Sequence, residues 1–108
     1  MSDLFVEITE STWDAEVVQS ETPVLLDFWA PWCGPCKALE PTLVGLAGLY
    51  AGRVKFGKVN VDQNPSVRER FGVRGIPHLQ LMRGDVRVGV LSARTRTRLM
   101  VELDALLA

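Results

Sequence analysis

The only two cysteines of the chain, Cys33 and Cys36, are separated by two residues in the sequence CGPC. They directly follow an apolar run typical of a buried strand, and they open a segment with helical periodicity. In the first turn of a helix, this spacing lets both sulfurs meet in a small disulfide ring. Unpaired N–H groups and the positive dipole end of a helix favour thiolate over thiol. Because only the thiolate attacks a disulfide, we predict redox chemistry with Cys33 as the nucleophile.

A static disulfide and a metal site are the alternatives for this pair. The start of the chain, Met1–Leu4, has no basic segment followed by an apolar stretch, so we expect a cytoplasmic protein, where structural disulfides are rare. An exported protein without its leader would have the same sequence. One histidine and two cysteines cannot fill a four-ligand site. We therefore expect no metal and no bound cofactor beyond a redox-active Cys33–Cys36 disulfide.

Asp27 is the one charged residue in the run Val24–Ala30, which is apolar at every other position. Such a run is typical of a central strand covered on both faces. A buried, unpaired carboxylate is energetically costly and tends to be neutralised through a raised pKa. Asp27 is therefore a candidate for general acid/base chemistry.

Periodicity divides the rest of the chain into alternating strands and helices. The expected strands cover residues 4–8, 24–30, 54–62, 78–82 and 86–91. The expected helices begin at Thr9 or Ser11, at Pro35, at Asn64 and at Thr95, and the last one ends near Leu107. This order predicts an α/β fold with a mixed sheet between two layers of helices. A length of 108 residues fits one domain covering residues 1–108.

Local signals add three expectations about these elements. Pro41 falls inside the second helix and predicts a kink there. The alternation of apolar residues shifts by one position at Gly57: Val54 and Phe56 precede it, whereas Val59 and Val61 follow it. This shift indicates either a bulge or a strand with two covered faces. Asn64 followed by Pro65 is typical of a helix start, and Gly72 is typical of a helix end.

The formal net charge of −1 is unevenly distributed. Residues 1–36 contain seven acids and no lysine or arginine, whereas residues 74–98 contain six arginines and one acid, Asp85. One interpretation is an ordinary solvated surface, and the other is a basic face that steers an acidic protein partner. Nucleic acid is not an expected partner because no aromatic residues alternate with the arginines. A membrane is not expected either, because no apolar run approaches the roughly 20 residues needed to span one.

Three segments of the chain resemble the thioredoxin family: residues 27–37, 58–65 and 73–77. They occur in the family's order, at close to its spacing, and the resemblance covers nearly the whole chain. It implies the thioredoxin fold, with a central mixed five-stranded sheet flanked by four helices. It also implies a monomeric protein-disulfide reductase that is itself re-reduced by thioredoxin reductase or an equivalent electron donor.

The resemblance also implies residue roles. Cys33 attacks a target disulfide to form a mixed disulfide, and Cys36 resolves it. Asp27 exchanges a proton with Cys36, and Lys58, the partner lysine on the adjacent strand, belongs to the same catalytic set. Lys58 could also satisfy the Asp27 carboxylate structurally, and the two roles are compatible. The bond before Pro77 is expected to be cis and to pack opposite Cys33. The remaining residues of the expected substrate-docking surface are Trp32, Gly34, Pro35, Gly75, Ile76 and Ser92.

Some positions depart from the family pattern. His78 follows the expected cis-proline, where the family usually has a small residue. Ser92 occupies the place of a family glycine in an ungapped alignment from Gly84, although an alignment through Gly89 is the alternative. Arg94 and its neighbours crowd the start of the last helix, where the helix dipole disfavours cations. These departures predict a narrowed range of targets, with acidic targets favoured.

Two further functions have to be weighed against disulfide reduction. A disulfide oxidant or isomerase would use the same chemistry, but the Gly-Pro dipeptide between the cysteines resembles the reducing members. A redox-independent binding subunit would have no need of the intact set of Asp27, Cys33, Cys36, Lys58 and Pro77.

Overall fold

The computed structural model describes residues 4–108 and contains a five-stranded sheet in the order β1-β3-β2-β4-β5. The strands are β1 (Phe5–Glu7), β2 (Val24–Trp29), β3 (Lys55–Asn60), β4 (His78–Arg83) and β5 (Val86–Leu91). The helices are η1 (Asp14–Val18), α1 (Gly34–Leu49), α2 (Pro65–Arg70) and α3 (Arg96–Leu107). β1 and β2 run parallel to β3, whereas β4 is antiparallel to both β2 and β5. The predicted mixed sheet with four helices is confirmed.

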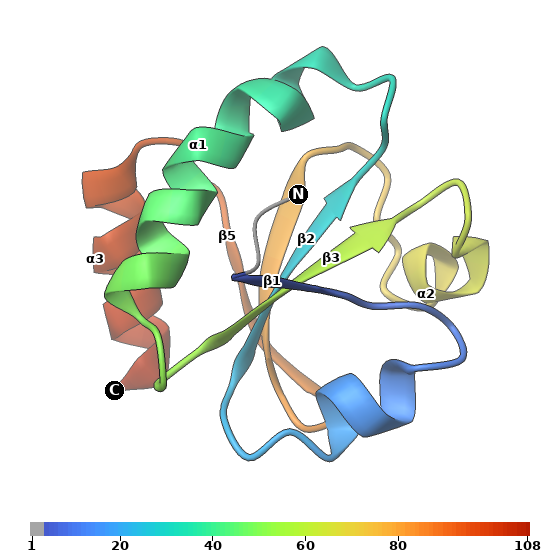
Figure 1. The fold of residues 1–108 in the computed structure, drawn as a ribbon, viewed down its shortest axis with the longest axis horizontal. Coiled ribbons are helices and arrows are strands. Elements are labelled where there is room, and N and C mark those ends of the chain that lie inside the picture. The colour runs from blue at the N-terminus through green and yellow to red at the C-terminus, as the bar shows by residue number, and fades with distance from the viewer. Residues whose placement is uncertain (1–3) are drawn as a thin grey trace.

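Helices cover both faces of this sheet (Figure 1). α1 and α3 pack on one face, where Leu43 and Leu99 belong to one core cluster. η1 and α2 pack on the other face, where Val17 and Val67 belong to a second cluster that also contains both cysteines. All of β2 except Trp29 is buried, which confirms the prediction of a central strand covered on both faces.

β3 accounts for the shift in apolar alternation at Gly57. Its pairing with β2 is continuous from Lys55 to Asn60, so the shift marks two covered faces and the bulge alternative is wrong. A Cβ atom on Gly57 would lie 2.7 Å from Cγ1 of Ile8, which is fully buried. The missing side chain of Gly57 therefore makes room for the Ile8 side chain.

The first expected helix starts later in the structure, and the third starts as predicted but without its expected side-chain cap. The first helix is a five-residue π-helix that begins only at Asp14, and Thr9 instead accepts a hydrogen bond from the N–H of Thr12 in the preceding turn. α2 starts with Pro65 and is followed by Gly72 at φ +63°, as predicted. The side chain of Asn64 does not cap α2.

The Asn64 side chain has two other partners. Its Oδ1 accepts from the N–H of Glu10 at 3.0 Å, and its Nδ2 donates to the carbonyl of Asn60 at 3.1 Å. A tertiary contact therefore replaces the local cap, and it ties the loop after β3 to the N-terminal segment.

The β4–β5 hairpin has the predicted position, with Gly84 in the turn at φ +56°. Its register shifts between Leu81, which pairs with Gly89, and Met82, which pairs with Arg87. The extra residue, Val88, forms an irregularity that the sequence did not indicate. Pro41 lies inside α1 as expected, and the kink there stays a prediction. Among residues 4–108, no helix is both long and apolar enough to cross a membrane.

Candidate active site

The predicted cysteine pair forms a disulfide at the start of α1. Cys33 is the N-cap residue in an extended conformation, and its Sγ accepts a hydrogen bond from the N–H of Cys36 at 3.2 Å. Pro35 occupies the first helical turn, where its missing N–H has no cost. The two Cα atoms are 5.3 Å apart, and each cysteine is only 4% exposed. The disulfide therefore sits against the core with a backbone donor already directed at the first sulfur.

The expected cis peptide bond between Ile76 and Pro77 is confirmed, and it lies next to this disulfide. The Sγ atom of Cys33 is 3.9 Å from the carbonyl oxygen of Ile76. The topology explains the proximity, because β2 ends just before the cysteines and β4 begins just after Pro77. The two strands are antiparallel neighbours, with Phe28 opposite His78. The C-terminal end of β2 and the N-terminal end of β4 therefore lie at the same end of the sheet.

The residues around the disulfide form an open surface. Trp32 is 67% exposed and its Nε1 donates to Asp62 at 2.8 Å, which orients the indole ring. A Cβ atom on Gly34 or on Gly75 would meet no atom within 4 Å among the described residues. These two glycines therefore leave space free beside the sulfurs and relieve no crowding within the fold.

Pro35 and Pro77 meet in a shallow pocket beside the disulfide. The pocket has a volume of about 310 Å³ and is also lined by Ala38, Leu39 and Arg94. The guanidinium of Arg94 donates to the carbonyl of Pro77 at 3.0 Å, and also to the carbonyls of Leu91 and Ala93. Arg94 thus bridges the segment before α3 and the cis-proline, a role that the sequence did not indicate.

Asp27 lies on β2, the strand that precedes the cysteine segment, and is 4% exposed. Its Oδ1 has no hydrogen-bond partner within residues 4–108. Burial raises the pKa of this carboxyl to about 7; the charges of Lys58 and Arg94 partly oppose the rise, and the charge of Glu40 adds to it. The raised pKa expected from the sequence is confirmed, and it places Asp27 where it can exchange a proton near neutral pH.

Lys58 lies directly opposite Asp27 in the β2–β3 register, also 4% exposed. Its ammonium nitrogen is 3.5 Å from Oε2 of Glu40 and 4.4 Å from the centre of the Trp29 ring. The described residues contain no ion pair between Lys58 and Asp27, so a carboxylate satisfied by this lysine is not what the structure contains. Glu40 is a functional candidate that the sequence analysis missed. Its position four residues after Cys36 on α1 was the available signal.

The sequence model of the thioredoxin family matches residues 4–105. The chain is 45% identical to the thioredoxin of Allochromatium vinosum over 105 residues, which are 96% of this chain and 98% of that protein. It is 52% identical to the thioredoxin of Thiocapsa roseopersicina over 83 residues, 77% of this chain and 91% of the relative. Thioredoxin 1 of Nostoc is 43% identical over 99 residues, with 91% and 92% covered. This chain belongs to the thioredoxin family.

As a thioredoxin with an intact Cys33–Cys36 pair, the protein is a thiol–disulfide oxidoreductase. The family uses no cofactor besides this redox-active disulfide. Within residues 4–108, no group of three or more histidine, cysteine or acidic side chains could hold a metal ion.

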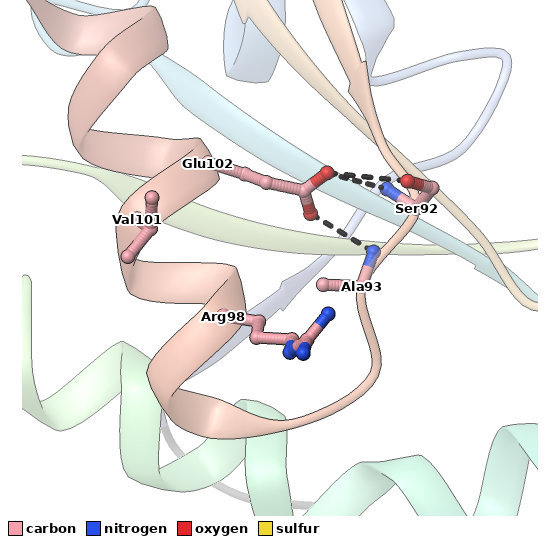
Figure 2. A pocket seen from close by; sticks show the side chains of 5 residues that line it. All are labelled: Ser92, Ala93, Arg98, Val101 and Glu102. Atoms are coloured by element: carbon pink, nitrogen blue, oxygen red, sulfur yellow. Dashed lines mark hydrogen bonds between the residues drawn. The ribbon is translucent and has the colours of Figure 1, made fainter.

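Ser92 lies in a different pocket from the one lined by Pro35 and Pro77. Figure 2 shows Glu102 reaching from α3 to the segment after β5, where the N–H and hydroxyl of Ser92 each donate to its Oε2 at 3.2 Å. The N–H of Ala93 donates to Oε1 at 2.9 Å. These contacts hold the segment that carries Arg94 against α3. The pocket, about 440 Å³, is also lined by Arg98 and Val101.

Gly89 and Ser92, the two positions that the alternative alignments place at the family glycine, have different surroundings in the structure. A Cβ atom on Gly89 would lie 2.6 Å from Cδ2 of Leu106, so this glycine serves the packing of β5 against α3. Ser92 directly follows β5 and leads into the segment that contacts the cis-proline through Arg94.

The other family departures are also placed. The His78 ring packs edge-on against Phe28 at 5.5 Å, and its Nε2 is 2.9 Å from Oε1 of Gln80, so the side chain turns toward the sheet. Arg83 and Arg87 donate to the carbonyls of Leu107 and Phe71. The arginines between residues 74 and 98 are therefore spread over several elements.

Proposed function

We propose that this thioredoxin works as a protein-disulfide reductase, with Cys33 as the attacking and Cys36 as the resolving residue. The observation that carries the proposal is the position of Sγ of Cys33, 3.9 Å from the carbonyl of Ile76 and next to the cis-proline. An extended target segment that pairs with the backbone of Ile76 would bring its disulfide to this sulfur.

The proposed reaction starts from the reduced protein. The Cys33 thiolate attacks one target sulfur, the target S–S bond breaks, and the other target sulfur leaves as a thiolate that takes up a proton. Cys36 gives its proton to Asp27, and its thiolate attacks Sγ of Cys33. The mixed disulfide breaks, the second target sulfur leaves and is protonated, and the Cys33–Cys36 disulfide forms. Two electrons have then passed from the cysteine pair to the target.

A complete cycle requires an external electron donor. We propose thioredoxin reductase or an equivalent reductase, which supplies two electrons to the Cys33–Cys36 disulfide. We also propose that residues 1–108 form a single thioredoxin domain, that the protein is a monomer, and that it is located in the cytoplasm. The proposed docking surface consists of Trp32, Gly34, Pro35, Gly75, Ile76, Pro77 and Ser92.

Arg94 supports a preference for acidic targets. Its guanidinium is exposed beside the pocket of Pro35 and Pro77, and the contacts given above are made to neutral carbonyls. None of the ion pairs found within residues 4–108 involves Arg94, although its charge acts on Asp27 and Glu102. A cation at the edge of a docking site would attract an acidic side chain of a bound target. We propose a narrowed, acid-favouring target range on this basis.

Reduction of insulin disulfides with dithiothreitol as the electron source tests the proposed function. We expect turnover by the wild-type protein and none by Cys33→Ser. Wild-type protein that fails to reduce insulin but refolds scrambled ribonuclease would indicate an isomerase. Inactivity in both assays would indicate a redox-independent binding subunit.

A further inference from the structure

The ion pair between Lys58 and Glu40 has an unusual consequence for the buried Asp27 carboxyl. Asp27 and Lys58 lie opposite each other on neighbouring strands, where an acid and a base would ordinarily pair. The ammonium of Lys58 lies instead 3.5 Å from Oε2 of Glu40 on α1, and Oδ1 of Asp27 is left without a hydrogen bond among the described residues. The pairing leaves the buried Asp27 carboxyl without an ion-pair partner within residues 4–108.

The two acids differ in their access to water. The side chain of Glu40 is 35% exposed, whereas Asp27 as a whole residue is 4% exposed. A half-exposed carboxylate stays ionised at little cost, while a buried one does so only with a counter-charge. Glu40 therefore gives Lys58 a partner near the surface, and Lys58 does not need Asp27 as its counter-ion.

The charged groups that act on Asp27 come from three elements. Lys58 acts from β3 and Glu40 from α1, and Arg94 acts from the segment before α3. The two cations lower the pKa of Asp27 and Glu40 raises it, although burial has the largest effect. Glu40 is the one acid in this set. It raises the pKa of Asp27 by its own charge, and it also forms the ion pair with Lys58.

We propose that Glu40 is a positioning residue that holds the Lys58 ammonium away from Asp27, so that Asp27 can take up and return a proton near neutral pH. The proposal rests on the proposed function of Asp27 as the proton-exchange partner of Cys36. Glu40 touches neither the sulfurs nor a target, and it acts on the reaction only through Lys58 and Asp27. The alternative is a structural ion pair that fastens α1 to β3 and leaves the protonation of Asp27 unchanged.

NMR titration of the Asp27 side-chain carbon in the oxidised protein separates these roles. We expect Glu40→Gln to move the titration midpoint of Asp27 down by about 0.5 to 1 pH unit, since a free opposite charge at 4–6 Å is associated with shifts of about 1 to 3 units. Glu16→Gln is the matched control. Glu16 also pairs with a β3 lysine, Lys55, at 3.7 Å. An equal midpoint in wild type, Glu40→Gln and Glu16→Gln would overturn the proposal.

A second comparison tests whether the effect passes through Lys58. In a Lys58→Met background, Glu40→Gln should move the Asp27 midpoint by less than half of its effect in wild type, because only the direct charge interaction remains. The same shift in both backgrounds would overturn the positioning role. If Lys58→Met does not fold, the comparison of Glu40→Gln with Glu16→Gln decides the question alone.

Kinetics then separate this proposal from the proposed function. In Glu40→Gln, the pH midpoint for resolution of the mixed disulfide should move with the NMR midpoint, while attack by Cys33 keeps its wild-type rate. If the NMR titration midpoint of Asp27 moves and the pH midpoint for resolution does not, Glu40 still sets the protonation of Asp27. That result would remove Asp27 from the proposed reaction.

Discussion

Asp27 and Lys58 face each other in register across β2 and β3, yet Lys58 pairs with Glu40 at 3.5 Å and Asp27 keeps an unsatisfied oxygen. A fold selected for stability alone would place an apolar residue at this buried position or pair the carboxylate closely. The unpaired carboxyl lies on the strand that precedes a disulfide whose proposed chemistry needs a proton acceptor. The cost in stability and the capacity for proton exchange therefore have one cause, the burial of Asp27.

Asp27→Asn should stabilise the oxidised protein at alkaline pH. The pKa of Asp27 is raised from 3.8 to about 7 in the folded state, so the wild-type carboxyl favours folding least once it is ionised. Its contribution is fully present below pH 4 and is lost as the pH rises through 7. At about 1.4 kcal/mol per pKa unit, the variant should gain roughly 4 kcal/mol above pH 8 and little at pH 4. Urea unfolding across this range measures the gain, with the exposed Asp14→Asn as control; a gain independent of pH would disprove the linkage.

The same Asp27→Asn substitution should slow resolution of the mixed disulfide more than the first attack. An amide cannot accept the proton that Cys36 must lose before it attacks Cys33. Stopped-flow mixing of the reduced variant with a chromogenic disulfide separates the two steps. We expect a drop of about 10²-fold or more in the second step, the lower end of what general acid–base catalysis typically contributes. Unchanged rates in both steps from pH 6 to 8 would exclude the general-base role.

The arrangement around the disulfide was predictable because it depends on residue types with few conformational choices. The apolar run of β2 predicts a central strand, and Pro35 predicts a helix start. The family resemblance of the segment at Pro77 implied a cis bond, which the structure contains. These features follow from backbone preferences and from segments with a recognisable pattern, and they place Cys33 and Cys36 correctly.

Side-chain partners from distant parts of the chain were not predictable in this way. Asn64 has the right residue type and position for a helix cap. Its side-chain oxygen instead accepts a hydrogen bond from the N–H of Glu10, 54 residues away. Lys58 follows the family pattern, but its ammonium group forms an ion pair with Glu40 on another element. In each case a tertiary contact competes with the partner that sequence proximity or resemblance implies, and the outcome depends on distances that no sequence pattern contains.

Cys36→Ser should form a persistent mixed disulfide with a target, whereas Cys33→Ser should form none. The N–H of Cys36 already points at Sγ of Cys33, and a donor in this position stabilises the thiolate that attacks first. Cys36 is the only thiol that can release the target afterwards. Non-reducing electrophoresis and mass spectrometry detect the complex. Equal alkylation rates of the two thiols in the reduced wild type at pH 7 would contradict the assignment of Cys33 as nucleophile.

Gly57→Ala should destabilise the fold by about 1 to 3 kcal/mol, the usual cost of an added methyl group in a packed core. The new Cβ would lie 2.7 Å from Cγ1 of Ile8 and 3.4 Å from Cδ2 of Leu26, both fully buried. Gly48→Ala on the exposed side of α1 is the matched control. It adds the same methyl group with no atom within 4 Å among the described residues, and it should be neutral or stabilising. Thermal unfolding compares the two, and equal stability of both variants would contradict the close packing on Gly57.

Arg94→Leu should remove the proposed preference for acidic targets. The guanidinium lies at the pocket of Pro35 and Pro77, so its charge should speed association with an acidic segment and slow that with a basic one. Reduction rates of an acidic and a basic disulfide peptide should differ most at low salt. They should converge near physiological ionic strength, where the Debye length is about 8 Å.

The matched control for this experiment is Arg87→Leu. Arg87 also donates to a backbone carbonyl, that of Phe71, but it does not line the pocket of Pro35 and Pro77. Arg87→Leu removes the same net charge from the protein as Arg94→Leu. It should keep the preference for the acidic peptide, because the proposed attraction depends on where the charge lies. If Arg87→Leu lowers the preference as much as Arg94→Leu does, net charge alone accounts for it. If the wild type shows no preference at low salt, this thioredoxin does not select acidic targets.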